Sequence, residues 1–600
     1  MKKILSTLLL IVLGLTAKAQ NLENIFTVNG IRYRITSVDN HEACVIKNAD
    51  NTCASYSGTI AIPDTVEYSG VYYRVTSIDD NAFYFSTISS LSLPQGIRSI
   101  GNTAFYCATI SGNIVLPDSL RYIGEDAFHA VRNAQSVYIP ALVDTIGLCA
   151  FARMPDLRNL VVDSANAKYV SENSVLYNKE KTILLASASD VTGTLVVPSG
   201  VKRLDYVSLA TSKYSQIVLP NTVRRIGIGA FWQCENLETI NIPASVNCIE
   251  GGVFAAVNQL CRIIIDSTST NYKLVDNAVY SFNMDTLISH NFASGDVVLP
   301  QGVKIISNNS FTETRNLNSI ELPNGVEKIE QSAFQNSSMV RINLPNTLKS
   351  IGDFAFCTTA LEDIVIPNSV TELGEYVFYG TPLESVVMSD SVKVIPNSAF
   401  YLCRYLNSYT GGASVERIEE YAFSMCGTFA QNLVLPPTLK FIGHLAFLDT
   451  DVKQVEFTGV VDTVGILNFG NLTKLVLKNA IPPYTYDNPI ANQVFRVVIP
   501  CGATEAYLAD PSWNSYTYVE DCDGIEESEE SNVRVVAKSR GIEVLNAEGC
   551  SVAIYDAVGR CLVNEPANGN SNSHRYYNVP TAGVYVVRVD DRGYKVVVSN

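Results

Sequence analysis

Residues 216–237 read QIVLPNTVRRIGIGAFWQCENL, and this stretch contains the pattern that decides the fold. An apolar strand at 217–219 ends at Pro220, and a second apolar pair and a glycine lead to Phe231. The pattern recurs every 22 or 23 residues apart from two longer gaps, with prolines at Pro94, Pro117, Pro140, Pro198, Pro220, Pro243, Pro300, Pro323, Pro345 and Pro367. A repeated unit of this length predicts a solenoid, in which each coil packs only on its neighbours.

One position of almost every repeat holds a phenylalanine. These residues are Phe83, Phe105, Phe128, Phe151, Phe231, Phe254, Phe311, Phe334, Phe356, Phe378, Phe400, Phe423, Phe447 and Phe469. Leu209 takes the position in one repeat, which makes about fifteen repeats. Because successive coils are one strand spacing apart, we expect the rings to stack as an internal ladder. The glycine after the second apolar pair, as in Gly124, is expected to form a positive-φ turn.

The two longer gaps resemble each other in sequence. Their matched residues lie 103 positions apart: Asp163 and Asp266, Tyr169 and Tyr272, Tyr177 and Tyr280. The match indicates a duplicated segment. Each gap is predicted to hold a β-hairpin flap, at 174–185 and at 277–288.

The repeat consensus ΦxΦPxxΦxxIGxxAFxxCxxL, where Φ is apolar, resembles the BspA-like (Treponema-type) leucine-rich repeat over residues 58–478. The fold class expected is mainly β, with a leucine-rich-repeat solenoid of about fifteen repeats, capping segments and a small C-terminal β-sandwich. The resemblance implies a non-catalytic, adhesin-like protein that contacts host proteins or other cells.

The rest of the chain divides into shorter segments. Residues 1–19 begin with two lysines, continue with an apolar run and end in Ala17-Lys18-Ala19, which is typical of a signal peptide. The apolar run is short for a membrane anchor, and no transmembrane segment is expected after its removal. The other expected segments are an N-terminal cap (20–57), a C-terminal cap (479–522), an acidic linker (523–531) and a β-sandwich (532–600).

The last segment carries a second resemblance. Its runs IYDAVGR (554–560), GVYVVRV (583–589) and KVVV (595–598) resemble the C-terminal sorting domain of the bacterial type IX secretion system. That resemblance assigns Gly583, Tyr585 and Lys595 to a sorting motif. It also implies the export machinery as a partner, and secretion to, or beyond, the outer-membrane surface of a Gram-negative bacterium.

Composition excludes some classes of function. The chain is 47% hydrophobic and 17% charged, with a net charge of −16, which argues against nucleic acid or an anionic membrane as partner. It contains no nucleophile elbow, HExxH, P-loop or dinucleotide fingerprint. The five histidines are scattered. No catalytic residue, cofactor or metal site is therefore predicted.

The fourteen cysteines form no CxxC pair. In an exported chain disulfides can persist, and the candidate pairs flank the repeats: Cys44 with Cys53, Cys501 with Cys522, and Cys550 with Cys561. Cys234, Cys403 and Cys426 each follow a ladder phenylalanine by three residues. We expect these three to be buried thiols.

The middle residue of each ΦxΦ strand should point away from the core. The candidate binding face built from these residues comprises Tyr138, Val218, Asn241, Glu321, Asn343, Val365, Val387 and Val434. Its valines have two interpretations: the β-propensity of an exposed strand, or an apolar strip that an extracellular protein covers. An alternative hypothesis is that Tyr177 and Tyr280 of the two flaps grip a glycan, and a third is that the array is a structural spacer.

Overall fold

The computed structural model describes residues 24–48, 56–257, 261–290, 292–427, 432–466, 472–486 and 496–522, and then 534–538, 541–545, 547, 550–557, 560–566, 574–581, 583–590 and 592–598. The chain divides into two compact units, Met1–Ala430 with Ile442–Asp451, and Gln431–Phe441 with Val452–Asn600. The candidate signal peptide, Cys53 and the acidic linker lie outside the described residues. The Cys44–Cys53 pair therefore stays a prediction.

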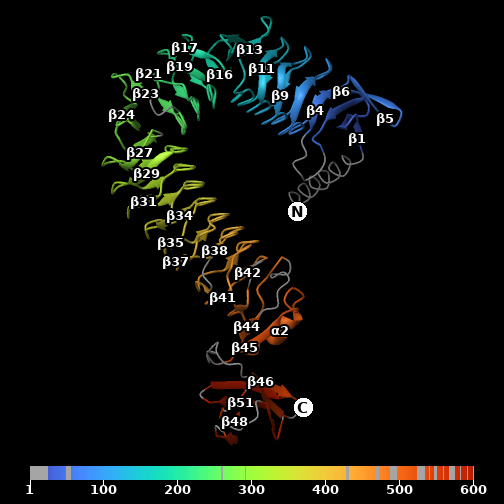
Figure 1. Cartoon of the computed structure of the whole chain (residues 1–600), viewed down its shortest axis with the longest axis vertical. Coiled ribbons are helices and arrows are strands. Elements are labelled where there is room, and N and C mark those ends of the chain that lie inside the picture. The colour runs from blue at the N-terminus through green and yellow to red at the C-terminus, as the bar shows by residue number, and fades with distance from the viewer. Residues whose placement is uncertain are drawn as a thin grey trace, which may run out of the picture. The chain divides into compact units, whose positions relative to one another are not determined.

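The fold is mainly β, a solenoid of about 19 turns at roughly 22-residue spacing with small antiparallel sheets at the C-terminal end. The predicted fold class is confirmed. The number of turns exceeds the fifteen or so repeats counted from sequence, because coils next to the inserts and at the ends lack the ladder phenylalanine. In Figure 1 the strands β9 (Thr109–Val115), β11 (Arg132–Ile139) and β13 (Asn159–Val162) follow one another as neighbouring rungs.

The apolar run before each proline forms the longer strand of its coil, and these strands pair in parallel. In the first unit they make four sheets. Besides β9, β11 and β13, the members are β4 (Ser57–Ala61), β7 (Thr87–Ser92), β17 (Thr192–Val196), β19 (Lys213–Val218), β21 (Thr239–Ile242), β23 (Arg262–Ile265), β27 (Ser294–Val298), β29 (Asn316–Glu321), β31 (Arg341–Asn343), β33 (Asp363–Val365), β35 (Ser385–Met388) and β37 (Ser408–Gly411). Where a proline follows the strand it ends the pairing, because it has no N–H for the ladder.

A second ladder of two-residue strands runs along another side of the coils. Its members in the first unit are β8 (Ser99–Ile100), β10 (Tyr122–Ile123), β12 (Thr145–Ile146), β18 (Arg203–Leu204), β20 (Arg225–Ile226), β22 (Cys248–Ile249), β28 (Ile305–Ile306), β30 (Lys328–Ile329), β32 (Ser350–Ile351), β34 (Glu372–Leu373), β36 (Val394–Ile395) and β38 (Arg417–Ile418). The second residue of each pair is, in most coils, an isoleucine or leucine of the core.

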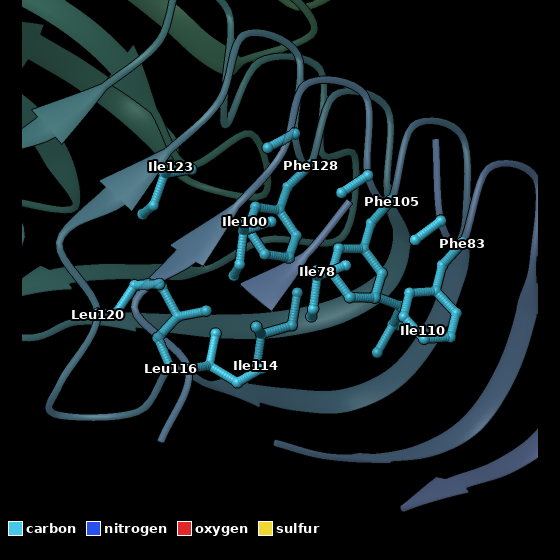
Figure 2. Packing of buried hydrophobic residues seen from close by; sticks show 14 of the residues in the cluster. Ile78, Phe83, Ile100, Phe105, Ile110, Ile114, Leu116, Leu120, Ile123 and Phe128 are labelled. Atoms are coloured by element: carbon cyan, nitrogen blue, oxygen red, sulfur yellow. The ribbon is translucent and has the colours of Figure 1, made fainter. Parts of the chain in front are cut away.

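The predicted phenylalanine ladder fills the core between these sides. Figure 2 shows Phe83, Phe105 and Phe128 in one row. Their ring centroids are 4.9 and 5.0 Å apart with interplanar angles of 9° and 6°. All three side chains are fully buried, as is Leu209 in its Phe-less coil. Stacking of this kind adds to the free energy gained by burying the ring area.

The glycine after each short strand has a different role from the one predicted. The backbone at Gly124 is outside the positive-φ region. A Cβ atom there would lie 2.5 Å from the backbone nitrogen of Asn102 in the preceding coil. Glycine is therefore required by the close approach of two coils. Positive φ occurs instead two residues before and two residues after the ladder phenylalanine, as at Thr103 (52°) and Cys107 (54°).

The two inserts are larger than hairpins. Each is a three-stranded antiparallel meander, β14 (Tyr169–Glu172), β15 (Val175–Asn178) and β16 (Ile183–Ser187) in the first, and β24 (Tyr272–Val275), β25 (Ala278–Ser281) and β26 (Thr286–Ser289) in the second. The third strand pairs in parallel with the short strand of the next coil. The chain opens in the same way, with β1 (Ile25–Val28), β2 (Ile31–Ser37) and β3 (Glu42–Val45) leading into β6 (Val71–Ile78), which also pairs with β5 (Thr65–Tyr68).

Each meander also closes the ladder that precedes it. The backbone N–H of Ile146 donates to the Tyr169 hydroxyl oxygen at 2.9 Å, and that of Ile249 donates to the Tyr272 hydroxyl at 2.8 Å. The two tyrosines thus satisfy backbone groups that the next rung would otherwise pair. The short strands before and after each meander consequently belong to different sheets.

The second unit holds a five-stranded parallel sheet of β39 (Asn432–Leu435), β41 (Gln454–Phe457), β43 (Lys474–Val476), β44 (Arg496–Pro500) and β45 (Thr517–Asp521), with the helix α2 (Thr504–Ala509). Two antiparallel sheets follow: β46 (Arg534–Lys538), β47 (Gly541–Leu545) and β50 (His574–Asn578), then β49 (Cys561–Glu565), β48 (Val552–Asp556), β51 (Gly583–Val589) and β52 (Arg592–Val598). The helices in the described part of the chain are too short or too polar to span a bilayer.

Candidate functional site

The predicted binding-face residues stand in register on neighbouring strands. Val218 pairs with Asn241, Glu321 with Asn343, and Val365 with Val387. Tyr138 lies between Val115 and Val161, and Val434 pairs with Glu456. The residues that alternate with these point into the core, as the period of two requires. Each sheet therefore presents one continuous row.

Most of this row is open to solvent. Val365 is 62% exposed and Val434 61%, whereas Val387 is 43% and Tyr138 39% exposed. Asn241, Glu321 and Asn343 are exposed, and Val218 is half-buried. We call the outward middle residues of the long strands the strand-face row. Its exposed valines carry no charge and offer an apolar contact area.

Two members of the strand-face row were not predicted from the sequence pattern. Val161 on β13 and Ile264 on β23 are 44% and 37% exposed and stand in register with Tyr138 and Asn241. Both lie on strands that lead into an insert, where no proline marks the end of the strand. The available signal was the run of three apolar residues in each of NLVV and RIII.

Polar groups border the row. The Tyr138 hydroxyl donates to the Asp163 carboxylate at 2.5 Å, and this bond raises the pKa of Tyr138 and lowers that of Asp163. Asp296 accepts hydrogen bonds from the Asn318 amide at 2.6 Å and from the Ser319 hydroxyl at 2.5 Å. Both bonds lower the pKa of Asp296, and the bond from Ser319 has the larger effect. These carboxylates stay ionised and are held by neighbours, an arrangement suited to contact rather than to acid–base chemistry.

The hypothesis that Tyr177 and Tyr280 of the inserts grip a glycan is wrong, because both side chains are buried. Tyr177 is 1% exposed and Tyr280 2% exposed, on β15 and β25 respectively. Burial is the main cause that raises the pKa of Tyr280 to about 12. The Tyr177 ring packs in a core cluster that includes Leu184 and Leu195, so it belongs to the interior of the coils. Neither ring can grip a ligand.

The structure describes both cysteines in two of the three predicted pairs. A disulfide joins Cys501 and Cys522, with 4.5 Å between their Cα atoms. In contrast to the prediction, Cys550 and Cys561 are not bonded to each other: the Cys561 thiol donates to the Val563 carbonyl at 3.1 Å, and Cys550 hydrogen-bonds the Asp590 carboxylate. Cys561 stands opposite Tyr555 near the end of β48, whereas Cys550 precedes the start of that strand, so the register keeps the two cysteines apart.

The repeat cysteines are buried thiols, as expected. Burial raises the pKa of Cys234 to about 12 and raises those of Cys403 and Cys426 as well. A protonated, buried thiol is a poor nucleophile. Within the described residues, the one group spaced to hold a metal ion is Cys501, Glu520 and Cys522, whose two sulfurs are already bonded to each other.

The residues assigned to a sorting motif lie on the last two strands. Gly583 opens β51, where its backbone pairs with Val598. Tyr585 is buried, and its hydroxyl donates to the Thr581 carbonyl at 2.6 Å. The backbone of Lys595 pairs with Val586. In this structure Tyr585 is a core residue of the C-terminal sheets.

Several solved structures are similar to this chain. A leucine rich cell surface protein from Faecalibacterium prausnitzii is 23% identical, with 64% of this chain and 94% of that chain covered and a TM-score of 0.35. The pneumococcal vaccine antigen PcpA is 18% identical, with 76% and 99% covered and a TM-score of 0.30. A leucine-rich repeat protein from Bacteroides ovatus is 21% identical, with 82% and 100% covered and a TM-score of 0.29.

No curated protein matches the chain. The sequence model of the BspA type leucine rich repeat region matches residues 66–182, 188–295, 289–407 and 393–488. These ranges take in well over half of the chain and nearly all of its coils. The chain therefore belongs to the BspA-type leucine-rich repeat family.

Proposed function

We propose that this protein is a non-catalytic, secreted or surface-exposed binding protein that holds an extracellular protein ligand on the strand-face row. The observation that supports this most is the in-register row of exposed apolar side chains, exemplified by Val365 and Val387 on adjacent strands. Apolar side chains lined up on a long exposed surface favour a partner that covers them.

The proposal is tested by binding of the mature chain, residues 20–600, to immobilised extracellular-matrix, mucin and bacterial-surface proteins. We expect at least one saturable partner, and we expect Val365→Glu with Val387→Glu to weaken it at least tenfold. The matched control is Thr371→Glu with Val394→Glu, which adds the same two charges at exposed positions of the short-strand side. Binding should survive in this control.

Two results would contradict the proposal. One is a panel in which no protein binds saturably, which would favour the role of a structural spacer. The other is a partner whose affinity is the same for the wild type and for the strand-face double variant. Circular dichroism of both double variants shows that a lost signal comes from the surface and not from unfolding.

We further propose that residues 1–19 direct secretion and that residues 532–600 act as a type IX sorting domain in a Gram-negative host. The supporting observations are the residue pattern of each segment and the two small antiparallel sheets of the second. Deleting 532–600 should leave the protein in the periplasm, as measured by cell fractionation. Normal surface delivery of the truncated chain would contradict a sorting role.

A further inference from the structure

Two columns of side chains flank the ladder phenylalanines on the turn side of the coils, and their exposure differs from coil to coil. The first column holds the residue two before the phenylalanine, and the second holds the residue one after it. Over the coils of Phe356 to Phe423 these columns become aromatic, with Phe354, Tyr376 and Tyr421 in the first and Tyr379 and Tyr401 in the second. All five rings are half-buried.

The five rings form one connected cluster. Phe354 and Tyr376 stack with 4.8 Å between centroids and an interplanar angle of 2°. Tyr376 and Tyr379 lie 6.0 Å apart across the two columns, and Tyr379 and Tyr401 lie 5.4 Å apart along the second column. Because the coils are rigidly paired, the spacing of these rings is set before any ligand arrives.

A groove of about 400 Å³ opens beside this cluster. Its aromatic lining is Phe354, Tyr376 and Tyr379, and its polar lining includes the amides of Gln335 and Asn336. The Thr358 hydroxyl, also in the lining, donates to the Asn336 side-chain oxygen and holds that amide in place. The volume lies within the usual range for sites that bind small ligands, and the mixture of rings with a few polar groups is typical of them.

The first column places its rings on strained backbone. Phe354 has φ 56° and Tyr376 φ 55°, in the left-handed region. Other coils fill the same position, also at positive φ, with Asn81 (58°), Asn309 (56°), Ser332 (54°), Val207 (45°) or Leu445 (53°). Asparagine tolerates this conformation far better than a bulky aromatic residue does. The fold therefore accepts polar, aliphatic and aromatic residues at this position and does not require rings here.

We propose that this groove binds a sugar ring of an uncharged glycan. A pyranose presents an apolar C–H face that can pack on an aromatic ring, and a rim of hydroxyls that can bond to the Asn336 and Gln335 amides. None of the lining side chains carries a charge, since burial raises the pKa of the Cys357 thiol that completes the lining. An anionic ligand would therefore find no cation among them.

A quaternary ammonium ligand fits the groove less well than a sugar does. An aromatic cage surrounds a cation with separated rings, whereas Phe354 and Tyr376 stack on each other at 4.8 Å and leave no space between them. The groove is separate from the strand-face row, whose residues are not in its lining. The glycan site is thus an addition to the proposed protein-binding surface.

The test is saturation-transfer NMR on the mature full-length chain with lactose, maltose, cellobiose, mannobiose and N-acetyllactosamine as probes. We expect at least one of these disaccharides to receive saturation. The double variant Phe354→Asn with Tyr376→Asn should weaken its binding at least tenfold. This variant copies Asn81 and Asn309 at the same column and φ, so its melting temperature should not fall.

Two controls separate the groove from aromatic surface in general. Tyr84 stacks on Tyr106 at 5.4 Å in the second column, and Tyr84→Gln copies Gln335 at that position, so this variant should bind sugar like the wild type. The strand-face variant Val365→Glu with Val387→Glu should also bind sugar normally. That result would hold whether or not a protein ligand is found.

Three results would overturn the proposal. They are no saturation of any of the five disaccharides, unchanged sugar binding in the folded Phe354→Asn, Tyr376→Asn variant, and displacement of the sugar by tetramethylammonium at equal concentration. The last result would identify a cation site in place of a sugar site.

Discussion

The glycine that follows a short strand shows how closely successive coils approach each other. At Gly124 the space for a Cβ atom is already occupied by the backbone nitrogen of Asn102 and the carbonyl carbon of Gly101. Backbone atoms cannot move aside as the end of a flexible side chain can. The residue type was predictable from sequence, but its cause was not, because a repeated glycine does not distinguish a tight contact from a left-handed turn.

This difference predicts the outcome of Gly124→Ala. The added methyl must push two coils apart, and we expect a loss of about 1–3 kcal/mol in the free energy of unfolding. A left-handed turn is not involved, so Gly124→Asn should be no better tolerated than Gly124→Ala. Chemical denaturation followed by circular dichroism provides the measurement.

The control for this prediction is Gly583→Ala. A Cβ atom at Gly583 would have no heavy atom within 4 Å, and its φ is not positive. We expect that substitution to be neutral or to stabilise by up to about 1 kcal/mol, since alanine restricts the unfolded chain. Equal stabilities of the Gly124→Ala variant and the wild type would show that the coils can separate at no cost.

At the scale of elements, the strands and the ladder were predictable and the inserts were not. The period of 22 or 23 residues identifies each long strand, its proline and its phenylalanine, because every coil repeats the same packing problem. An insert occurs outside this period. The alternation around Tyr177 correctly indicates the hairpin of β15 and β16, but it does not indicate that β14 precedes them or that the Tyr177 ring faces the core.

The disulfide is the element-scale feature with a measurable stability effect. It joins the residues that follow β44 and β45, the last two strands of the parallel sheet, across a sequence separation of 21 residues. A loop of that length is expected to contribute about 3 kcal/mol by restricting the unfolded chain. Reduction should therefore lower the denaturant midpoint of the second unit while the first unit is unaffected.

Hydrogen–deuterium exchange with and without a phosphine reductant distinguishes the two units. The variant Cys501→Ser with Cys522→Ser is the control, since its exchange should not respond to the reductant. Faster exchange of the first unit on reduction, or no change in β44 and β45, would refute this prediction.

At the scale of the whole molecule, contacts between neighbouring coils stabilise the solenoid. Phe356 stacks on Phe334 at 5.2 Å and on Phe378 at 5.4 Å, and its contacts extend no further along the ladder. Repeat arrays of this kind can open locally without unfolding elsewhere. A destabilising substitution in the core should therefore raise amide exchange only in the neighbouring coils.

Phe356→Ala is expected to remove about 3–5 kcal/mol of packing free energy. Amide exchange should rise sharply in the coils of Phe334, Phe356 and Phe378 and stay at its wild-type rate in the coils of Phe105 and Phe128. Peptide-resolved exchange measured by mass spectrometry checks this. A uniform increase along the array would mean that the coils unfold as one cooperative body.

The surfaces were predictable only in part. Alternation along the strands located the strand-face row from Tyr138 to Val434, since a period of two assigns inside and outside directly. The aromatic groove was not predicted, because Phe354 and Tyr376 lie outside the strand alternation from which the surface was assigned. Its residues are regularly spaced, however, and comparing the column positions coil by coil would have shown them.

The two meanders make the array divisible into cassettes. Asp163 and Asp266 precede equivalent meanders 103 residues apart, and Tyr169 and Tyr272 bond the preceding ladder in the same way. Removing residues 164–266 would place the second meander where the first now stands, with Tyr272 opposite Ile146. Recombination at these joints can change the number of coils, and with it the area offered to ligands, by one whole cassette in a single step.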